Sequence, residues 1–334
     1  MHPITRIAAV CIGAALSRSA LCAQATPAAA RTPRAGLDVP SWAFPLPAPA
    51  PAAALDSVTL LHVPRSSQAF TAVQVRNQFA IPDWHPDTHP AMPPIVAHGR
   101  KPTVIACGFC HLPNGVGRPE NATLAGLPAA YIVQQVADIK SRARQSAWEG
   151  PFRPMELMRA IADSSTDADI AAAARYFSRI RPHQRARVVE ARDIPRPIPA
   201  LGLYFPAESG SVEPLGQRLI EMPVEPERHE MRDAEVEYVA YVPPGSIARG
   251  RALAITVTRT APKPCASCHG PQLRGVGLVP PIAGRSPSYI LRQLLAFKTG
   301  RRAAPASAPM RDVAATLSLD DMIAAAAYAG SRKP

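Results

Sequence analysis

A pattern of two cysteines, two intervening residues and a directly following histidine occurs twice in this chain. Residues 107–111 read CGFCH and residues 265–269 read CASCH, at an offset of 158 residues. Two thiols at this spacing can add across the two vinyl groups of a haem, and the adjacent histidine then lies under the iron as the proximal ligand. The residues predicted for attachment and proximal ligation are Cys107, Cys110 and His111 in the first motif and Cys265, Cys268 and His269 in the second.

The cysteine count favours haem over other uses of these motifs. The chain has six cysteines, and the two outside the motifs, Cys11 and Cys22, lie near the N-terminus. A zinc site would need a second cysteine pair or paired histidines nearby, and a redox dithiol would not need the adjacent histidine. We therefore expect two covalently bound haem c groups and no spare thiol for a structural disulfide.

The N-terminus is typical of an export signal, which we place at residues 1–25. Arg6 supplies the positive charge, residues 7–17 form the apolar segment, and small residues precede a cleavage site after Ala23 or Ala25. An uncleaved membrane anchor is the alternative, but this apolar segment is too short to span a bilayer. The sequence therefore predicts a periplasmic protein that associates with a membrane only through a partner.

An internal repeat surrounds the two motifs. Tyr131 and Gln135 match Tyr289 and Gln293 at the offset of 158 residues. Towards the end of each half the offset becomes 152, and hydroxyl and acidic residues there are typical of helix starts. We expect each half to have a helix before the motif, one after the loop that follows it, and one at its end.

Two further segments lie outside the repeat. Residues 26–91 are an Ala- and Pro-rich linker and N-terminal extension, with a short β-like run at residues 58–63. Residues 182–244 form a Pro-rich, partly acidic strap with a few short strands, too polar and too short for a good core of its own. The repeated halves are then domains at residues 92–181 and 245–334.

Two methionines at equivalent positions of the repeat are candidates for the second axial ligand of each iron. Met158 and Met310 align at the offset of 152 residues. A thioether opposite histidine raises the reduction potential and fills both axial positions, which suits electron transfer. A single methionine on a helix is more often core filler, and Met155, which directly follows a proline, is the alternative to Met158.

These motifs make each half resemble class I cytochrome c, and the tandem order is similar to the two-haem cytochrome c4 group. The resemblance implies an all-α fold for each half, Met–His ligated iron and electron transfer. In that family a proline carbonyl after the motif orients the proximal histidine, and Pro280 fits this role, whereas the first half has Ala122. The expected fold class is mainly α, with two tandem class I cytochrome c domains joined by a Pro-rich strap with short β-strands.

The net charge of +12 favours a redox partner protein with an acidic docking face. Nucleic acid is another usual partner of basic proteins, but no interleaved aromatic and basic pattern supports it here. Matching basic clusters follow the helix after each motif, and they are interpreted equally well as solvated helix ends or as contacts to a partner or to haem propionates. These residues are Lys140, Arg142 and Arg144 in the first half and Lys298, Arg301 and Arg302 in the second.

His85 and His89 are the remaining candidates for a metal or partner site. Prolines follow both residues and break the helical spacing between them, so we expect residues of a surface turn.

The leading functional hypothesis is an electron carrier that is not an enzyme. The cytochrome subunit of a periplasmic dehydrogenase complex is the alternative, and a two-haem peroxidase, which needs an open axial position, is a weaker one.

Overall fold

The computed structural model describes residues 38–49, 54–257 and 263–334. The expected export signal and residues 26–37 of the expected linker lie outside the described residues. Within the described ranges, no helix combines the length and the apolar character needed to cross a membrane.

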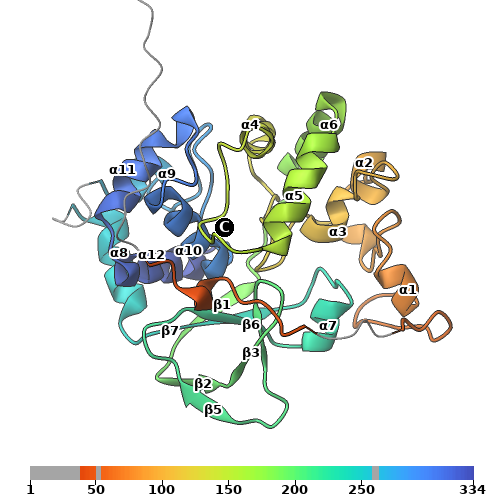
Figure 1. Cartoon of the computed structure of the whole chain (residues 1–334), viewed down its shortest axis with the longest axis horizontal. Helices are drawn as coiled ribbons and strands as arrows, with labels where there is room; N and C mark the ends of the chain where they lie inside the picture. Colours follow the sequence, from red (N-terminus) through yellow and green to blue (C-terminus); the bar gives the residue numbers. More distant parts are fainter. Residues whose placement is uncertain (1–37, 50–53, 258–262) are drawn as a thin grey trace, which may run out of the picture. The chain divides into compact units, whose positions relative to one another are not determined.

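Helices form in both halves where the repeat predicts them (Figure 1). The first half contains α2 (Pro94–Ala97), α3 (Cys107–His111), α4 (Ala129–Lys140), α5 (Arg153–Ser164) and α6 (Asp167–Ser178). The second half contains α8 (Ser246–Ile255), α9 (Ala266–His269), α10 (Pro287–Lys298), α11 (Ala308–Thr316) and α12 (Leu319–Ser331). Helices α4 and α10 have equal length and begin 158 residues apart, which is the offset of the motifs.

The last helix of each half begins with a capping box. Thr166 accepts a hydrogen bond from the backbone N–H of Asp169 at the start of α6, and the Asp169 side chain accepts from the Thr166 N–H. Ser318 and Asp321 make the same exchange at the start of α12. Each box satisfies N–H groups that the first helical turn leaves without partners. The predicted N-cap chemistry is therefore confirmed.

Helices α8 and α12 pack at van der Waals contact of their backbones. A Cβ atom on Gly250 would lie 1.9 Å from the carbonyl oxygen of Ala324, so only glycine fits at this crossing. The helices bury a core that includes Leu253, Met322 and Ile323. A separate core in the first half forms around Phe177 and Val96.

The strap between the halves contains short strands. Its three-stranded sheet has the order β1-β7-β6, with β1 (Ala186–Glu190) parallel to β7 (Tyr238–Val242) and β6 (Ile220–Pro223) antiparallel to β7. Two small pairs, β2 (Asp193–Pro195) with β5 (Val212–Pro214) and β3 (Pro197–Pro199) with β4 (Tyr204–Pro206), and helix α7 (Pro226–Glu230) complete it. The strap also buries a cluster of apolar side chains, so it packs better than its composition predicts. The cluster includes Ile194, Tyr204, Leu215, Ile220 and Met222.

The N-terminal extension has less strand than expected. In place of a strand at residues 58–63 there is a single β-bridge between Leu61 and Phe70. The Phe70 ring packs edge-on against Trp84, with centroids 4.7 Å apart. Without a neighbouring strand the β-branched run has no ladder to join, so its propensity is not realised. The only helix longer than one 3₁₀ turn in residues 54–91 is α1 (Ala72–Val75), and 3₁₀ turns form at Ser41–Ala43, Pro86–Thr88 and Pro305–Ser307.

Candidate haem-binding sites

Each motif histidine is held by a backbone carbonyl eleven residues further on. His111 Nδ1 donates to the carbonyl oxygen of Ala122 at 2.8 Å, and His269 Nδ1 donates to that of Pro280, also at 2.8 Å. A carbonyl oxygen only accepts, so the proton lies on Nδ1, and Nε2 keeps the lone pair that binds iron. Burial lowers the pKa of both histidines, which favours this neutral form.

Ala122 keeps the role of the proline that it replaces. The expected backbone carbonyl is available and is bound to the histidine, so the departure from the family pattern leaves this hydrogen bond in place. Neighbouring hydrogen bonds fix this backbone, because Thr123 Oγ1 donates to the carbonyl oxygen of Val116 at 2.7 Å. Arg285, from the second half, donates to the carbonyl oxygen of Thr123 at 2.6 Å.

Within the described residues no disulfide links the four motif cysteines, so their sulfur atoms are available for thioether bonds to haem. Burial raises the pKa of Cys107 to about 12 and also raises the pKa values of Cys110 and Cys265. A redox dithiol reacts as the thiolate, which burial disfavours at Cys107, Cys110 and Cys265. Across the described parts of the chain, His, Cys, Asp and Glu residues form no group of three or more that could hold a metal ion.

The candidate methionines lie on equivalent helices. Met158 is in the middle of α5 and Met310 is in the first turn of α11, and both are half-buried. Met155 packs against the core that contains Phe152, as Met310 does, whereas Met158 belongs to none of the apolar clusters in the described residues. Because Met310 also packs on that core, packing does not separate a ligand from core filler, and Met158 remains the candidate through its equivalence to Met310 in the repeat.

The two halves meet at a pair of equivalent arginines. Arg144 and Arg302, 158 residues apart, form an isolated β-bridge. The N–H of Gln145 donates to the carbonyl oxygen of Arg301 at 2.8 Å, and the N–H of Ala303 donates to that of Ala143 at 2.6 Å. These contacts exchange equivalent residues, so the repeat has a local two-fold relationship at this point.

The side chains of both arginines belong to one polar cluster between the halves. Its other members are Gln135, Tyr289 and Gln293. Arg144 donates to Tyr289 Oη at 2.7 Å and to Gln293 Oε1 at 3.1 Å, and Arg302 donates to Gln135 Oε1 at 2.5 Å. Burial alone would raise the pKa of Tyr131, but the charges of Arg302 and Arg144 outweigh it and lower that pKa.

This cluster provides a test of whether the site fits a haem. Nε of both Arg144 and Arg302 is buried without a hydrogen-bond partner. Within the described ranges neither arginine forms a direct ion pair with a carboxylate, and the carboxylate of the buried Asp138, bound to Gln135, acts on Arg144 only through its charge. Buried cations need anionic partners, and haem propionates would be such groups. The propionate interpretation of the basic clusters is thus favoured for these two arginines.

The other members of the basic clusters face solvent or cap helices. Arg142 pairs with Asp163 at 2.7 Å and Arg301 pairs with Glu149, each pair at least partly exposed. Lys298 donates to the carbonyl oxygens of Ala315 and Leu317 near the end of α11. For these residues the interpretation as solvated helix ends is favoured.

The expectation that His85 and His89 lie in a surface turn is wrong. His85 is buried and its Nε2 lies 2.9 Å from Asp233 Oδ1, in the strap. His89 Nε2 lies 3.1 Å from Asp83 Oδ1, and the hydroxyl of Tyr176 lies 2.9 Å from its Nδ1. These partners are as far as 148 residues away in the sequence, so no local pattern could identify them.

Comparisons with known proteins find relatives that bind haem. No protein-family model matches the chain. It is 27% identical over 227 residues to cytochrome c4 of Azotobacter vinelandii, and the aligned region covers 66% of this chain and 82% of the relative. It is 27% identical over 233 residues to the thiosulfate dehydrogenase electron acceptor of Stutzerimonas stutzeri (strain A1501), over 69% of this chain and 80% of the relative. It is 42% identical over 77 residues to cytochrome c-554(547) of Halothiobacillus neapolitanus, over 21% of this chain and 85% of the relative.

Two solved structures are also similar. A thiosulfate dehydrogenase (TsdBA) from Marichromatium purpuratum has a TM-score of 0.46 and 29% identity, over 70% of this chain and 38% of that chain. The reduced recombinant cytochrome c4 from Pseudomonas stutzeri has a TM-score of 0.44 and 24% identity, over 68% of this chain and 93% of that chain.

The sequence relatives, together with the paired motifs and oriented histidines, define the class of protein. The chain belongs to the c-type cytochromes. Within them it is a cytochrome c4-like electron-transfer protein with two covalently bound haem c groups.

Proposed function

We propose that the chain is an exported, periplasmic electron carrier whose two repeated halves, residues 92–181 and 245–334, each bind one haem. Cys107 and Cys110 attach the first haem and Cys265 and Cys268 the second. His111 and His269 are the proximal ligands, and Met158 and Met310 are the opposite ones. The observation that carries the proposal is the matched pair of histidine–carbonyl hydrogen bonds, each 2.8 Å long, which leaves both Nε2 atoms free for iron.

The residues of the two sites suit a carrier better than an enzyme. When bound, each haem supplies an iron that alternates between ferrous and ferric states. A histidine fixed by its carbonyl and a methionine thioether close both axial positions, and the soft sulfur favours the reduced state. The peroxidase alternative needs an open position, which paired methionines at equivalent places argue against. The matched relatives support the carrier over that alternative.

The partner of such a carrier is another redox protein. The net charge of +12 favours an acidic docking face on that protein, and salt should weaken the encounter. One relative is named as the electron acceptor of a dehydrogenase. A dehydrogenase is therefore one class of donor that this proposal includes, with any membrane association occurring through the partner.

Haem counting tests the attachment residues. Replacing Cys107 and Cys110 together by Ala should lower the haem content from two to one per chain, because the thioether bonds of one site are lost. The matched variant with Cys265 and Cys268 replaced should lose the other haem and retain the first. Two haems per chain in either double variant would contradict the assignment.

A further inference from the structure

The segment after each motif differs between the halves in exposure. We call residues 112–122 the first haem loop and residues 270–280 the second haem loop; each ends at the carbonyl bound to the motif histidine. No residue of the first haem loop is exposed, whereas six of the eleven residues of the second are exposed. Both loops border a haem attachment site, so this difference bears on which haem a partner reaches.

The strap covers the first haem loop. Arg118 pairs with Glu120 at 2.7 Å, and Arg118 Nη1 lies 3.3 Å from the carbonyl oxygen of His229 in the strap. Gly202, also in the strap, lies so near that a Cβ there would come within 2.5 Å of the Cβ of Glu120. The ion pair of the loop is therefore buried under the strap and is not a surface charge.

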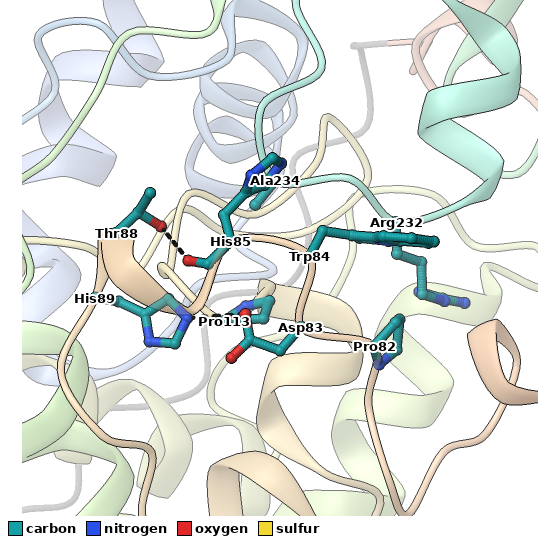
Figure 2. A pocket seen from close by; sticks show the side chains of 9 residues that line it. All are labelled: Pro82, Asp83, Trp84, His85, Thr88, His89, Pro113, Arg232 and Ala234. Atoms are coloured by element: carbon teal, nitrogen blue, oxygen red, sulfur yellow. Dashed lines mark hydrogen bonds and ion pairs between the residues drawn. The ribbon is translucent and has the colours of Figure 1, made fainter. Parts of the chain in front are cut away.

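The N-terminal extension and the strap also meet beside the first motif. Arg232 donates to the carbonyl oxygen of Phe109 at 2.6 Å, and its guanidinium carbon lies 3.5 Å from the centroid of that ring. Trp84 Nε1 donates to the carbonyl oxygen of Met231 at 2.7 Å. Figure 2 shows Trp84 and Arg232 around one pocket with Pro113 of the first haem loop. The chain itself thus occupies the surface of the first haem loop.

The second haem loop presents apolar side chains where the first has charges. Val276 and Leu278 are equivalent to Arg118 and Glu120, and they are 60% and 66% exposed. Hydrogen bonds fix the turn that carries them, because the N–H groups of Val276 and Val279 donate to each other's carbonyl oxygens at 3.1 and 3.0 Å. The loop therefore holds an apolar pair in a defined position at the surface.

The charged residues near this apolar pair in the sequence have one sign. Arg274 in the loop and Lys263 just before the motif are exposed. No aspartate or glutamate occurs in the sequence from Tyr238 to Arg311. An apolar patch with basic neighbours is complementary to a protein surface with an apolar centre and acidic rim.

We propose that the second haem loop, centred on Val276 and Leu278, is the docking surface for an acidic redox protein. The first haem then exchanges electrons with that protein through the second. This inference rests on the proposed carrier function. A haem held by Cys265, Cys268 and His269 would accept one electron from the reduced centre of the partner, with its iron changing from ferric to ferrous and no bond formed or broken.

The test measures electron exchange of the two-haem protein at a gold electrode. A mixed carboxylate- and methyl-terminated monolayer on the gold supplies the acidic surface with apolar character. Leu278→Glu brings a negative charge to the loop, so the interfacial electron-transfer rate at low ionic strength should fall about tenfold or more. Val212→Glu adds the same charge at a strap residue that is 68% exposed and should leave the rate within about twofold.

Each other outcome overturns a stated part of this inference. An unchanged rate in Leu278→Glu, or equal slowing in Val212→Glu, overturns the docking surface. Reductive titration in solution with a small reductant tests the carrier function separately, and uptake of fewer than two electrons per chain refutes that function. Dimerisation in analytical ultracentrifugation that Leu278→Glu abolishes would assign the patch to a second copy of the chain and overturn the acidic partner.

Discussion

The carbonyl oxygen of Ala122 lies 2.8 Å from Nδ1 of His111, the same distance that separates the carbonyl oxygen of Pro280 from Nδ1 of His269. The hydrogen bond comes from the backbone, so the absence of the proline ring leaves it intact. The ring does contribute a fixed φ, and without it the first haem loop depends on hydrogen bonds to the neighbouring carbonyls.

Arg285 makes two of those bonds and a third to the second half, and its removal should destabilise the protein. It donates to the carbonyl oxygens of Thr123 at 2.6 Å, Ala125 at 3.2 Å and Pro281 at 2.6 Å. Arg285→Leu, the residue type found at the equivalent Leu127, leaves these oxygens without that donor. The free energy of unfolding should fall by about 2–4 kcal/mol, measured by guanidinium unfolding of the haem-loaded protein.

An exposed arginine provides the control for this prediction. Arg274→Leu removes the same group from the surface, where a change under about 0.5 kcal/mol is expected. Equal losses for Arg285→Leu and Arg274→Leu would show that the buried hydrogen bonds of Arg285 contribute nothing special.

The methionine ligands can be identified by their removal. Met158→Ala should open the first iron, so that the reduced protein binds carbon monoxide with a changed absorption spectrum. Met310→Ala should do the same at the second iron. Met155→Ala removes a side chain that packs on the core, so the free energy of unfolding should fall by about 2–5 kcal/mol. It should not open the iron to carbon monoxide. Carbon monoxide binding by Met155→Ala, with none by Met158→Ala, would transfer the ligand to Met155.

The fold of each half follows from local signals, and the sequence predicts it well. Helix α10 repeats α4 at the motif offset, and hydroxyl and acidic residues mark the starts of α6 and α12. The strap is less predictable, because β1 and β7 pair in parallel across 52 positions, from Ala186 to Tyr238. Such pairing depends on tertiary packing rather than on residue type. The same holds for the β-like run at residues 58–63, which finds no partner strand.

In the haem sites too, some residues are predictable from local sequence and others depend on contacts between distant segments. Motif spacing predicts the cysteines and histidines, and the repeat proposes the methionines. Arg144 and Arg302 each bind side chains of the other half. Residue spacing within one half cannot predict these contacts. The burial of His85 likewise depends on Asp233, 148 residues away. The sequence therefore does not decide whether Arg144 and Arg302 face solvent or contact haem propionates, and its prediction that His85 lies in a surface turn is wrong.

Gly250 should be intolerant of a methyl group. Gly→Ala usually stabilises a helix by about 0.5–1 kcal/mol. In α8 the added Cβ would lie 1.9 Å from the carbonyl oxygen of Ala324, so α12 must move. Gly250→Ala should therefore lower the free energy of unfolding by about 1–3 kcal/mol or more. Urea unfolding checks this, with Arg251→Ala at an exposed position of the same helix as the control. A more stable Gly250→Ala protein would contradict the close crossing.

Arg144 and Arg302 should influence the reduction potentials of both haems. A buried positive charge favours the reduced iron, which carries one positive charge fewer. Arg144→Leu and Arg302→Leu should each lower both potentials by about 1 kcal/mol, or roughly 40 mV per electron, at an effective dielectric constant of about 20. Spectroelectrochemical titration measures the shift. Arg142→Leu removes an exposed charge that Asp163 already balances, so its shift should be much smaller. Comparable shifts in Arg142→Leu would argue against Arg144 and Arg302 as the cause.

The capping carboxylates predict an acid-dependent loss of stability. Burial alone would raise the pKa of Asp321, but its bonds to Arg249, at 2.9 and 2.8 Å, and to Ser318 outweigh it and lower that pKa. A carboxyl whose folded pKa is lowered stabilises the fold above its unfolded pKa of about 3.9, and this contribution is lost as the pH falls through the folded value.

Asp321→Asn should therefore be less stable than the natural chain by about 0.5–2 kcal/mol at pH 7. The difference should shrink between about pH 5 and pH 2, because the protonated carboxyl then resembles the amide. Asp169→Asn, in the first half, should show a smaller difference with the same pH trend. The Asp169 carboxylate is more exposed than that of Asp321, and its arginine lies further away, at 3.3 Å. Thermal unfolding of both variants across this pH range measures the effect, and a deficit that stays constant with pH would contradict the role of the charged carboxylates.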